Sequence, residues 1–432
     1  MSDAGYHALC PSYDAYREGF DRGEPQLLYR RAIGDLETPL SAYLKLTGNQ
    51  TGTFLLESVE GGEQLGRYST IGIGHDLVWQ CKNNKAELFG ADGALLSTGH
   101  DALASLKSLL DEQHRFSNHQ LHDDLPPMAS GLFGFFSYDF VRYIEDLPNT
   151  CEDVIQAPDA YLVRPKVVAT FDNVRRELVL VTTVRPSEEE DAQAAYDAAD
   201  LELNSLLQKL SEPLSSPASV TSAEPDFQSN MTPEEYKGAV QRAKDYIAAG
   251  DVFQVVLSQT WSADYDGNPL DVYRQLRRIN PSPFLFYLNF EPAVLLGASP
   301  EILVRVREGE VTIRPIAGTR RRGQTKADDE ALAEELLADE KERAEHLMLL
   351  DLGRNDVGRS AEPGTVKPTE TFVIERFSHV MHITSNVVGR LRAGLTPLDA
   401  MLHGFPAGTL SGAPKIRAME IIDELEVSAR GP

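Results

Sequence analysis

Predicted strands occur in groups along this chain, and helices separate the groups at irregular intervals. One group lies near residues 53–80, a strand pair follows near residues 167–184, and a third group extends over residues 252–318. A doubly wound sheet would instead need strands and helices that alternate regularly. The grouping therefore predicts an α+β fold.

A polar segment at residues 211–230 divides the chain into two parts. It reads SEPLSSPASVTSAEPDFQSN, which is rich in Ser, Pro and Ala and almost free of large apolar side chains. Such a composition is typical of an exposed linker. We therefore predict an N-terminal domain at residues 1–210, a linker at residues 211–230 and a second domain at residues 231–432.

Local signals predict individual elements of the second part. Thr232 and Glu235 form a capping-box pattern that predicts the start of a helix. The apolar, β-branched run at residues 252–261 predicts a strand, and Glu308-Gly309 marks a hairpin turn. A run rich in Ala, Leu and Glu predicts one long helix over residues 327–353.

The charge of the chain limits its partners. The formal net charge of −25 argues against nucleic acid, because phosphate binding needs clustered Lys and Arg. An acidic protein also repels anionic substrates at long range. A local cation or a set of aimed backbone amides is therefore required if the substrate is an anion.

The sequence gives further expectations about the compartment. No apolar run approaches the roughly 20 residues that cross a bilayer, so no membrane partner is expected. The N-terminus lacks the basic-then-apolar order of a secretory signal. The three cysteines lie far apart, which fits a reducing cytoplasm better than a disulfide framework.

Two carboxylates stand three residues apart in a predicted helix. Glu342 and Glu345 would share one face of that helix and could together hold Mg²⁺, which binds few carboxylates and keeps water and substrate oxygens. The alternative is a solvated face on which Lys341 and Arg343 are the ionic partners. Spacing alone favours the solvated face.

His379 and His382 lie in a predicted strand. Their odd spacing directs the two side chains to opposite faces, which makes a shared zinc ion improbable. One of them could act as an acid or hydrogen-bond donor in a polar cleft, and a satisfied core histidine is an equal alternative.

Three other polar positions are candidates for ligand contact. Gly408 to Gly412 lead into a helix whose free amides could bind an anion, and an ordinary capped helix is the alternative. Gly318 permits close backbone approach, the Thr319 hydroxyl can donate to a carboxylate, and a plain basic turn is the alternative. Gln254 is an amide in an apolar run, so it either contacts substrate or closes a core network.

Taken in order, these motifs resemble the chorismate-utilising enzymes, and within that group the anthranilate synthase component I family. The segments that carry the resemblance are SPE (299–301), RPIAGTR (314–320), KERAEHLMLLDLGRNDVGR (341–359), SHVMHITSNVVG (378–389) and GTLSGAPKIRAMEIIDELE (408–426). The resemblance implies a two-lobed, β-sandwich-like core with flanking helices and a central cleft.

Two positions indicate the branch of the family. Relatives that add water carry a lysine where this chain has Gln254, and aminodeoxychorismate synthases carry one where it has Ala317. The resemblance therefore implies Mg²⁺-dependent attack of ammonia on chorismate, followed by loss of pyruvate to give anthranilate. An aminodeoxychorismate synthase and a non-catalytic tryptophan-sensing subunit are the alternatives.

The resemblance also implies roles for single residues. Gly318, Thr319 and Thr409 would contact chorismate, and His382 would assist departure of the ring hydroxyl. Glu301 matches the general acid of the water-adding relatives. The remaining implied roles are catalytic for Gln254 and for Thr409, and Mg²⁺-ligating for Glu345 with Glu342.

Regulation and partners are implied as well. LLES at 55–58, GRYS at 66–69 and NPSPFLFY at 280–287 resemble a tryptophan feedback site, with Ser58, Pro283, Phe284 and Leu285 lining the pocket. Ammonia would come from a partner glutamine amidotransferase subunit. Family members continue past residue 432 with further substrate and Mg²⁺ ligands, so the C-terminal part is expected to be missing and the chain to turn over weakly or not at all.

Overall fold

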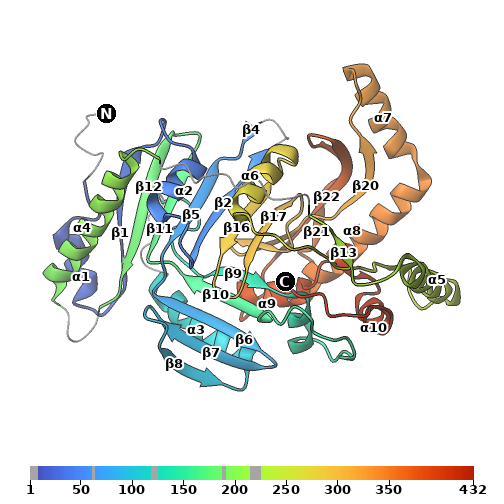
Figure 1. Cartoon of the computed structure of the whole chain (residues 1–432), viewed down its shortest axis with the longest axis horizontal. Helices are drawn as coiled ribbons and strands as arrows, with labels where there is room; N and C mark the ends of the chain where they lie inside the picture. Colours follow the sequence, from blue (N-terminus) through green and yellow to red (C-terminus); the bar gives the residue numbers. More distant parts are fainter. Residues whose placement is uncertain (1–7, 61–63, 118–124, 187–190, 215–224) are drawn as a thin grey trace.

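The computed structural model describes residues 8–60, 64–117, 125–186, 191–214 and 225–432. Helices and antiparallel sheets are mixed along this part of the chain, which confirms the α+β prediction. Figure 1 shows three groups of strands, with the longest helices on the outside of the first and third groups.

The largest sheet combines strands from both parts of the chain. Across it run β1 (Gln26–Ile33), β12 (Glu177–Val184), β11 (Val167–Asp172), β5 (Tyr68–Ile73), β2 (Thr53–Glu57), β16 (Phe284–Asn289) and β17 (Val294–Ser299). In the pairing of β16 with β2, Leu285 lies opposite Glu57. The sheet therefore contains strands from both sides of the predicted linker at 211–230. The division into two domains stays a prediction.

Helices bury the apolar side of this sheet. The helices are α2 (Pro39–Thr47), α4 (Ala192–Leu210) and α6 (Pro269–Ile279), with α1 (Tyr13–Phe20) packed on α4. Tyr43, Leu203 and Tyr273 from these helices form one core cluster with Leu55 and Leu285 of the sheet. Removing this apolar surface from water is the main stabilising term for the N-terminal half and for β16.

A second sheet packs on the first through aromatic side chains. Its strands, in order, are β8 (Leu95–Gly99), β7 (Lys85–Gly90), β6 (Leu77–Lys82), β10 (Ala160–Arg164) and β9 (Phe133–Phe136), and it is accompanied by α3 (Ala102–Ser117) and the 3₁₀ helix η2 (Tyr138–Tyr143). Phe54 of the first sheet stacks on Phe133 of the second with ring centroids 4.5 Å apart. A separate short hairpin pairs β3 (Val59–Glu60) with β4 (Gln64–Leu65).

The third sheet carries several of the predicted site residues. It contains β18 (Arg305–Arg307), β19 (Glu310–Ile313), β22 (Val380–Arg390), β20 (Ile316–Arg321) and β21 (Lys367–Arg376), and it packs against α7 (Lys326–Ala338), α8 (Glu340–Ser360) and α9 (Pro397–Gly404). The predicted turn between β18 and β19 is confirmed, since Glu308 and Gly309 both have positive φ and the two strands pair.

The predicted helix at 327–353 is wrong in one respect, because it is two helices. Asp339 has extended backbone angles (φ −68°, ψ 113°) and ends α7. Its carboxylate accepts hydrogen bonds from the backbone N–H groups of Lys341 and Glu342, so Asp339 is the N-cap of α8. This break sets the direction in which α8 presents Glu342 and Glu345.

The predicted strand at 252–261 is also wrong over most of its length. Only β14 (Gln254–Val255) and β15 (Trp261–Ser262) are paired, with β23 (Gly412–Ala413) and β13 (Gln228–Ser229) respectively. Between them the backbone N–H of Ser258 donates to the Glu426 side chain, so a tertiary contact replaces ladder pairing. The C-terminal elements are η3 (Gly408–Leu410) and α10 (Lys415–Leu425), and the capping box predicted at Thr232 is confirmed at the start of α5 (Pro233–Ala249).

Candidate active site

Helix α8 presents Glu342 and Glu345 to other elements rather than to solvent. The Glu342 carboxylate accepts a hydrogen bond from Arg320 Nη1 at 3.2 Å. The Glu345 carboxylate accepts one from Gln254 Nε2, also at 3.2 Å. Both glutamates are partly buried. Their hydrogen-bond partners therefore come from β20 and β14 rather than from Lys341 and Arg343 on the same helix.

His382 on β22 faces the turn of β20. Its Nδ1 lies 2.9 Å from the Gly318 carbonyl oxygen and 3.1 Å from Thr319 Oγ1. A carbonyl oxygen only accepts hydrogen bonds, so this contact places the proton on Nδ1 and leaves Nε2 for a ligand. His379 is exposed, and its Nε2 lies 2.7 Å from the Ile279 carbonyl oxygen, so the two histidines face different partners.

Gly318 joins the histidine group to helix α8. Its φ of +70° lies in the left-handed region, and a Cβ there would come within 3.3 Å of Glu342 Oε2 and 3.2 Å of Leu336 Cδ1. Any other residue would be strained in this conformation. Because Gly318 has no side chain, His382 and Glu342 can both lie close to this turn: His382 contacts the Gly318 carbonyl oxygen, and Glu342 lies beside its Cα.

Glu301 and Thr409 form a second polar pair. Thr409 Oγ1, on η3, donates a hydrogen bond to Glu301 Oε2 at 3.1 Å, and Glu301 follows β17. Burial raises the pKa of Glu301 from 4.5 to about 7, while the hydrogen bond from Thr409 opposes that rise. A carboxyl group with a pKa near neutrality can give up or take a proton at working pH.

The segment from Gly408 to Ala413 connects this pair to helix α8. A Cβ at Gly408 would lie 2.2 Å from Leu352 Cδ2, so the backbone rests directly on α8. At the other end of the segment, Ala413 pairs with Gln254. Helix α8 thus contacts both the turn at Gly318 and the segment at 408–413, which come from distant parts of the sequence.

Gln254 and Glu345 line a cavity of about 990 Å³ beside α8. The amide oxygen of Gln254 is buried and has no hydrogen-bond partner in the described structure. Leaving a buried acceptor unpaired costs about 1–3 kcal/mol, so such an atom is expected to meet a donor from a bound water or a ligand. Glu345 fixes the orientation of the Gln254 amide, because only the NH₂ group of that amide can donate to the Glu345 carboxylate.

The carboxylates of α8 fit Mg²⁺ in kind and number. Mg²⁺ commonly takes one or two carboxylates and completes its shell with water and substrate oxygens. No group of three or more His, Cys, Asp or Glu side chains suited to a metal occurs in the described part of the chain. Of the two carboxylates, that of Glu345 forms no ion pair with any residue that the structure describes, whereas that of Glu342 is bound by the Arg320 guanidinium.

Sequence reasoning did not give Arg320 a role. Its guanidinium forms ion pairs with Glu335, Asp339 and Glu342, which come from α7, the break and α8. Arg320 therefore fixes the break between the two helices and the position of Glu342. A basic residue next to the Gly318-Thr319 turn was the only sequence signal for it.

The four residues predicted for an inhibitor site lie at or next to the paired ends of β2 and β16 in the largest sheet. Leu285 is buried opposite Glu57, and Phe284 is exposed beside it. The backbone N–H of Gly66 donates to the Ser58 carbonyl oxygen at 2.7 Å, which joins the LLES and GRYS segments. Pro283 precedes β16 and is partly buried.

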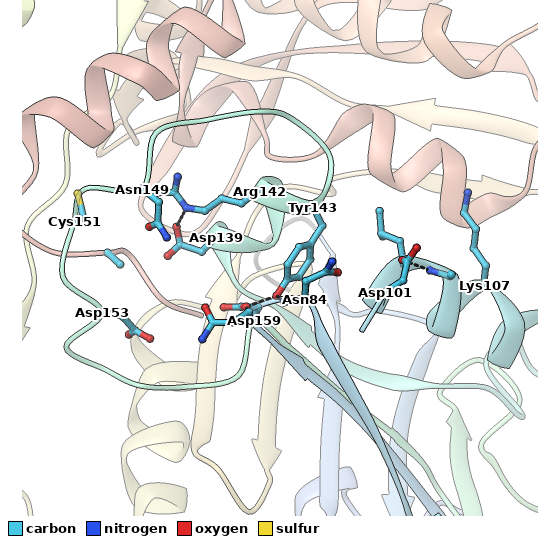
Figure 2. Close-up of a pocket in the computed structure, with 14 residues that line it drawn as sticks. Asn84, Asp101, Lys107, Asp139, Arg142, Tyr143, Asn149, Cys151, Asp153 and Asp159 are labelled. Carbon is cyan, nitrogen blue, oxygen red and sulfur yellow. Dashed lines mark hydrogen bonds and ion pairs between the residues drawn. The ribbon is translucent and has the colours of Figure 1, made fainter. Parts of the chain in front are cut away.

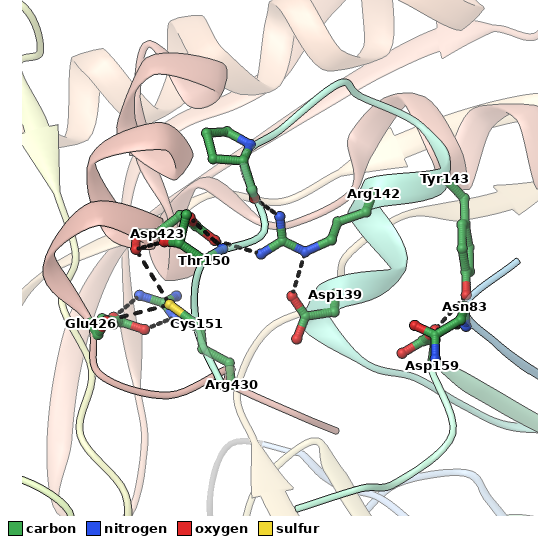
Figure 3. Close-up of polar contacts among 11 residues, drawn as sticks. Asn83, Asp139, Arg142, Tyr143, Thr150, Cys151, Asp159, Asp423, Glu426 and Arg430 are labelled. Atoms are coloured by element: carbon green, nitrogen blue, oxygen red, sulfur yellow. Dashed lines mark hydrogen bonds and ion pairs between the residues drawn. The ribbon is translucent and has the colours of Figure 1, made fainter. Parts of the chain in front are cut away.

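A polar cavity of about 710 Å³ lies away from these residues, between η2, the loop at 145–159 and the start of α3 (Figure 2). Its lining includes four aspartates together with Arg142 and Lys107, and Arg142 Nε donates to Asp139 Oδ1 at 3.0 Å. Figure 3 shows how Arg142 also reaches α10, where it donates to Asp423 Oδ1 at 2.8 Å. None of the predicted site residues lines this cavity.

Comparisons with known proteins agree on one family. The chorismate binding enzyme family matches residues 54–432. Anthranilate synthase component 1 of Cereibacter sphaeroides is 50% identical over 427 residues, which are 97% of this chain and 84% of that protein. The same component of Acinetobacter calcoaceticus is 46% identical over 94% of this chain and 82% of its own length.

Solved structures agree with the sequence matches. Anthranilate synthase component I from Streptococcus pneumoniae TIGR4 superimposes with a TM-score of 0.73 at 36% identity, covering 92% of this chain and 84% of that one. The isochorismate synthase MenF from Escherichia coli has a TM-score of 0.65 at 17% identity, over 97% of this chain and 84% of its own, and shares the fold.

Proposed function

Because the chain belongs to the chorismate binding enzyme family, we propose that it acts as an anthranilate synthase component 1 through the residues gathered around α8. It converts chorismate to anthranilate in tryptophan biosynthesis. The observation that carries the assignment of the site is the unpaired amide oxygen of Gln254, a residue whose Nε2 donates to Glu345 and which lines the cavity along α8 with it.

Gln254 is the proposed contact for the ammonia nucleophile. Ammonia has three N–H donors and one lone pair, so an unpaired carbonyl acceptor can hold it while the lone pair stays free to attack the ring. The amide cannot act as a general base at neutral pH. Ammonia, unlike water, needs no base to become a nucleophile, which agrees with an amide at this position.

Glu301 is the proposed proton donor, and His382 assists. When ammonia adds to chorismate, the ring hydroxyl must leave with a proton, and a carboxyl group of pKa about 7 supplies one readily. Thr319, Gly318 and Thr409 position the substrate by hydrogen bonds and close backbone approach. Loss of pyruvate from the aminated ring then gives anthranilate.

Glu345 is the proposed Mg²⁺ ligand, with Glu342 beside it. When bound, the ion supplies positive charge for the substrate carboxylate, which an acidic chain of net charge −25 otherwise repels. The finer expectation of a two-lobed sandwich with a central cleft fits such a site, since ligand pockets usually form where two parts of a fold meet.

The test is formation of fluorescent anthranilate from chorismate, Mg²⁺ and excess ammonium. It is run on the 432-residue chain and on one extended to the length of the curated relatives, because the match spans 84% of the Cereibacter protein. The comparisons do not support the expectation of weak turnover, and this pair of chains measures it. Aminodeoxychorismate as the only product would contradict the proposal.

Removing the Thr409 hydroxyl tests the second polar pair. In Thr409→Val we expect the KM for chorismate to rise roughly 10- to 100-fold, since one hydrogen bond to a charged group contributes about 1.5–3 kcal/mol. The Thr409 hydrogen bond lowers the pKa of Glu301, so its loss raises that pKa. Activity that depends on protonated Glu301 is therefore retained to a higher pH in the variant than in the wild type, so the alkaline limb of its pH profile moves to higher pH. An unshifted alkaline limb of the kcat/KM profile would remove Glu301 from the acid role.

Tryptophan is proposed as a feedback inhibitor at the end of the largest sheet. In Ser58→Val we expect the tryptophan concentration for half-inhibition to rise about tenfold, because one hydrogen bond of about 1.4 kcal/mol is lost. Ser97, exposed on β8, gives a matched Ser→Val control. Equal inhibition of both variants would place the tryptophan site elsewhere.

The relatives' designation as component 1 supports a complex with a second component, and we propose that this partner is a glutamine amidotransferase that supplies ammonia. Adding such a subunit is expected to let glutamine replace ammonium in the assay.

No helix in the described ranges is both long and apolar enough to cross a bilayer.

A further inference from the structure

A buried ion pair links α8 to the start of α10. Lys415 Nζ donates to Asp356 Oδ2 at 2.8 Å, and both side chains are only 10% exposed. The same ammonium group donates to the Gly404 carbonyl oxygen at 3.0 Å. Lys415 therefore joins three elements, because Asp356 lies on α8, Gly404 ends α9 and Lys415 begins α10.

The position of this lysine is unfavourable for α10 itself. A cation in the first turn of a helix opposes the positive end of the helix dipole. Burying an ion pair also gains little stability over well-packed apolar side chains, because both charges lose their water. Neither the helix nor the core explains a lysine at this point, so its contribution is expected to lie in the geometry that it imposes.

The pair closes a ring of contacts that contains the proposed metal ligand. Asp356 follows Glu345 by eleven residues, which is close to three full turns, so both lie on the same face of α8. Glu345 accepts from Gln254, and Gln254 pairs with Ala413, two residues before Lys415. Each contact in this ring limits how far α8 can slide or rotate against the segment at 408–413.

Asp356 also lies beside the second polar pair. It lines the same small pocket as Glu301 and Thr409. A shift of α8 relative to α10 would therefore change the separation between Glu345 and Gln254 and the separation between Glu345 and the Glu301–Thr409 pair together. The ion pair is the only contact of this ring that consists of two opposite charges.

We propose that Lys415 and Asp356 are positioning residues that hold Glu345 in register with Gln254 and with the Glu301–Thr409 pair. They act through the helices and do not touch the substrate. The inference rests on the proposed function, because it assumes that Glu345 binds Mg²⁺.

The test compares two buried ion pairs at opposite ends of α10. Lys415→Met breaks the pair at the start of the helix, and Arg142→Met breaks the pair with Asp423 near its end, where the side chains are 18% and 4% exposed. Lys415→Met leaves Asp356 buried without its cation, and Arg142→Met leaves Asp139 and Asp423 without theirs. Both variants are therefore expected to lower Tm. Mg²⁺ affinity is measured by titration calorimetry with chorismate present, and kcat and KM are measured separately.

Only Lys415→Met is expected to weaken Mg²⁺ binding, by about 10- to 100-fold, as found when the groups that orient metal ligands are removed. Lys415→Arg keeps the charge and is expected to recover most of the affinity. The double variant Lys415→Met/Asp356→Leu removes both charges, so its Tm is expected to return toward the wild type while Mg²⁺ binding stays weak.

The outcomes separate this inference from the proposed function. If Mg²⁺ binds equally well to Lys415→Met and Arg142→Met, the positioning role is wrong and Glu345 keeps its assignment. If the wild type does not bind Mg²⁺, or if Glu345→Gln binds it as tightly as the wild type does, the metal assignment is wrong. The inference is then lost with it.

Discussion

Replacing Glu301 by glutamine is expected to lower kcat for anthranilate formation by about 10²–10⁴-fold, the usual contribution of a general acid. Glutamine keeps the size of the side chain and can still accept the hydrogen bond from Thr409. It has no proton to give to the departing hydroxyl. KM is expected to change far less than kcat, because the lost interaction acts in the transition state. Steady-state kinetics at saturating ammonium measures both.

The same substitution is expected to stabilise the protein at alkaline pH. Burial raises the pKa of Glu301 from 4.5 to about 7, so the folded state binds its proton more tightly than the unfolded state does. This contribution to stability is complete below pH 4.5 and is lost as the pH rises through about 7, a difference of up to about 3 kcal/mol. Glu301→Gln avoids the cost of ionisation, so its Tm should exceed that of the wild type at pH 8 and approach it at pH 5.

Glu310→Gln is the matched control, since Glu310 is exposed on β19 and should change neither property. A loss of activity together with a gain of stability is typical of a group kept for chemistry. A Glu301→Gln enzyme with wild-type kcat would exclude the acid role, and an unchanged Tm at pH 8 would show that the carboxyl is better solvated than its surroundings indicate.

The fold class and one hairpin could be predicted from the sequence, but not which distant strands pair. Periodicity and capping residues located the helix at Thr232 and the hairpin at Glu308, because such signals act within a few residues. The pairing of β16 with β2 joins residues more than 200 positions apart, and no local pattern encodes it. The strand predicted at 252–261 failed for the same reason, since its partners lie in two separate segments, at 228–230 and at 411–426.

Site prediction had a similar limit. The spacing of Glu342 and Glu345 showed that they share a helix face, yet spacing alone favoured solvent for that face. What decides the matter is the arrival of Arg320 and Gln254 from other elements. The resemblance to a family supplied Glu301 and Thr409 as separate residues, and only the structure shows that they form a pair.

Replacing Glu345 by glutamine is expected to abolish Mg²⁺-dependent turnover, with kcat/KM lower by about three orders of magnitude. A metal ion that neutralises a substrate carboxylate contributes several kcal/mol to the reaction, and each 1.36 kcal/mol corresponds to a factor of ten. The glutamine oxygen can still accept the hydrogen bond from Gln254 Nε2, so the fold around α8 should persist. Titration with Mg²⁺ should show no saturation at concentrations that saturate the wild type.

Glu340→Gln is the control that separates loss of a ligand from loss of charge. Glu340 begins the same helix, is exposed, and contributes the same single negative charge to a strongly acidic chain. Removing either charge weakens long-range repulsion of chorismate to a similar small degree, which salt largely screens. Only Glu345→Gln should therefore lose Mg²⁺ dependence. Equal Mg²⁺ titrations of the two variants would mean that the metal ligands lie outside α8, and Glu345 would then serve only to orient Gln254.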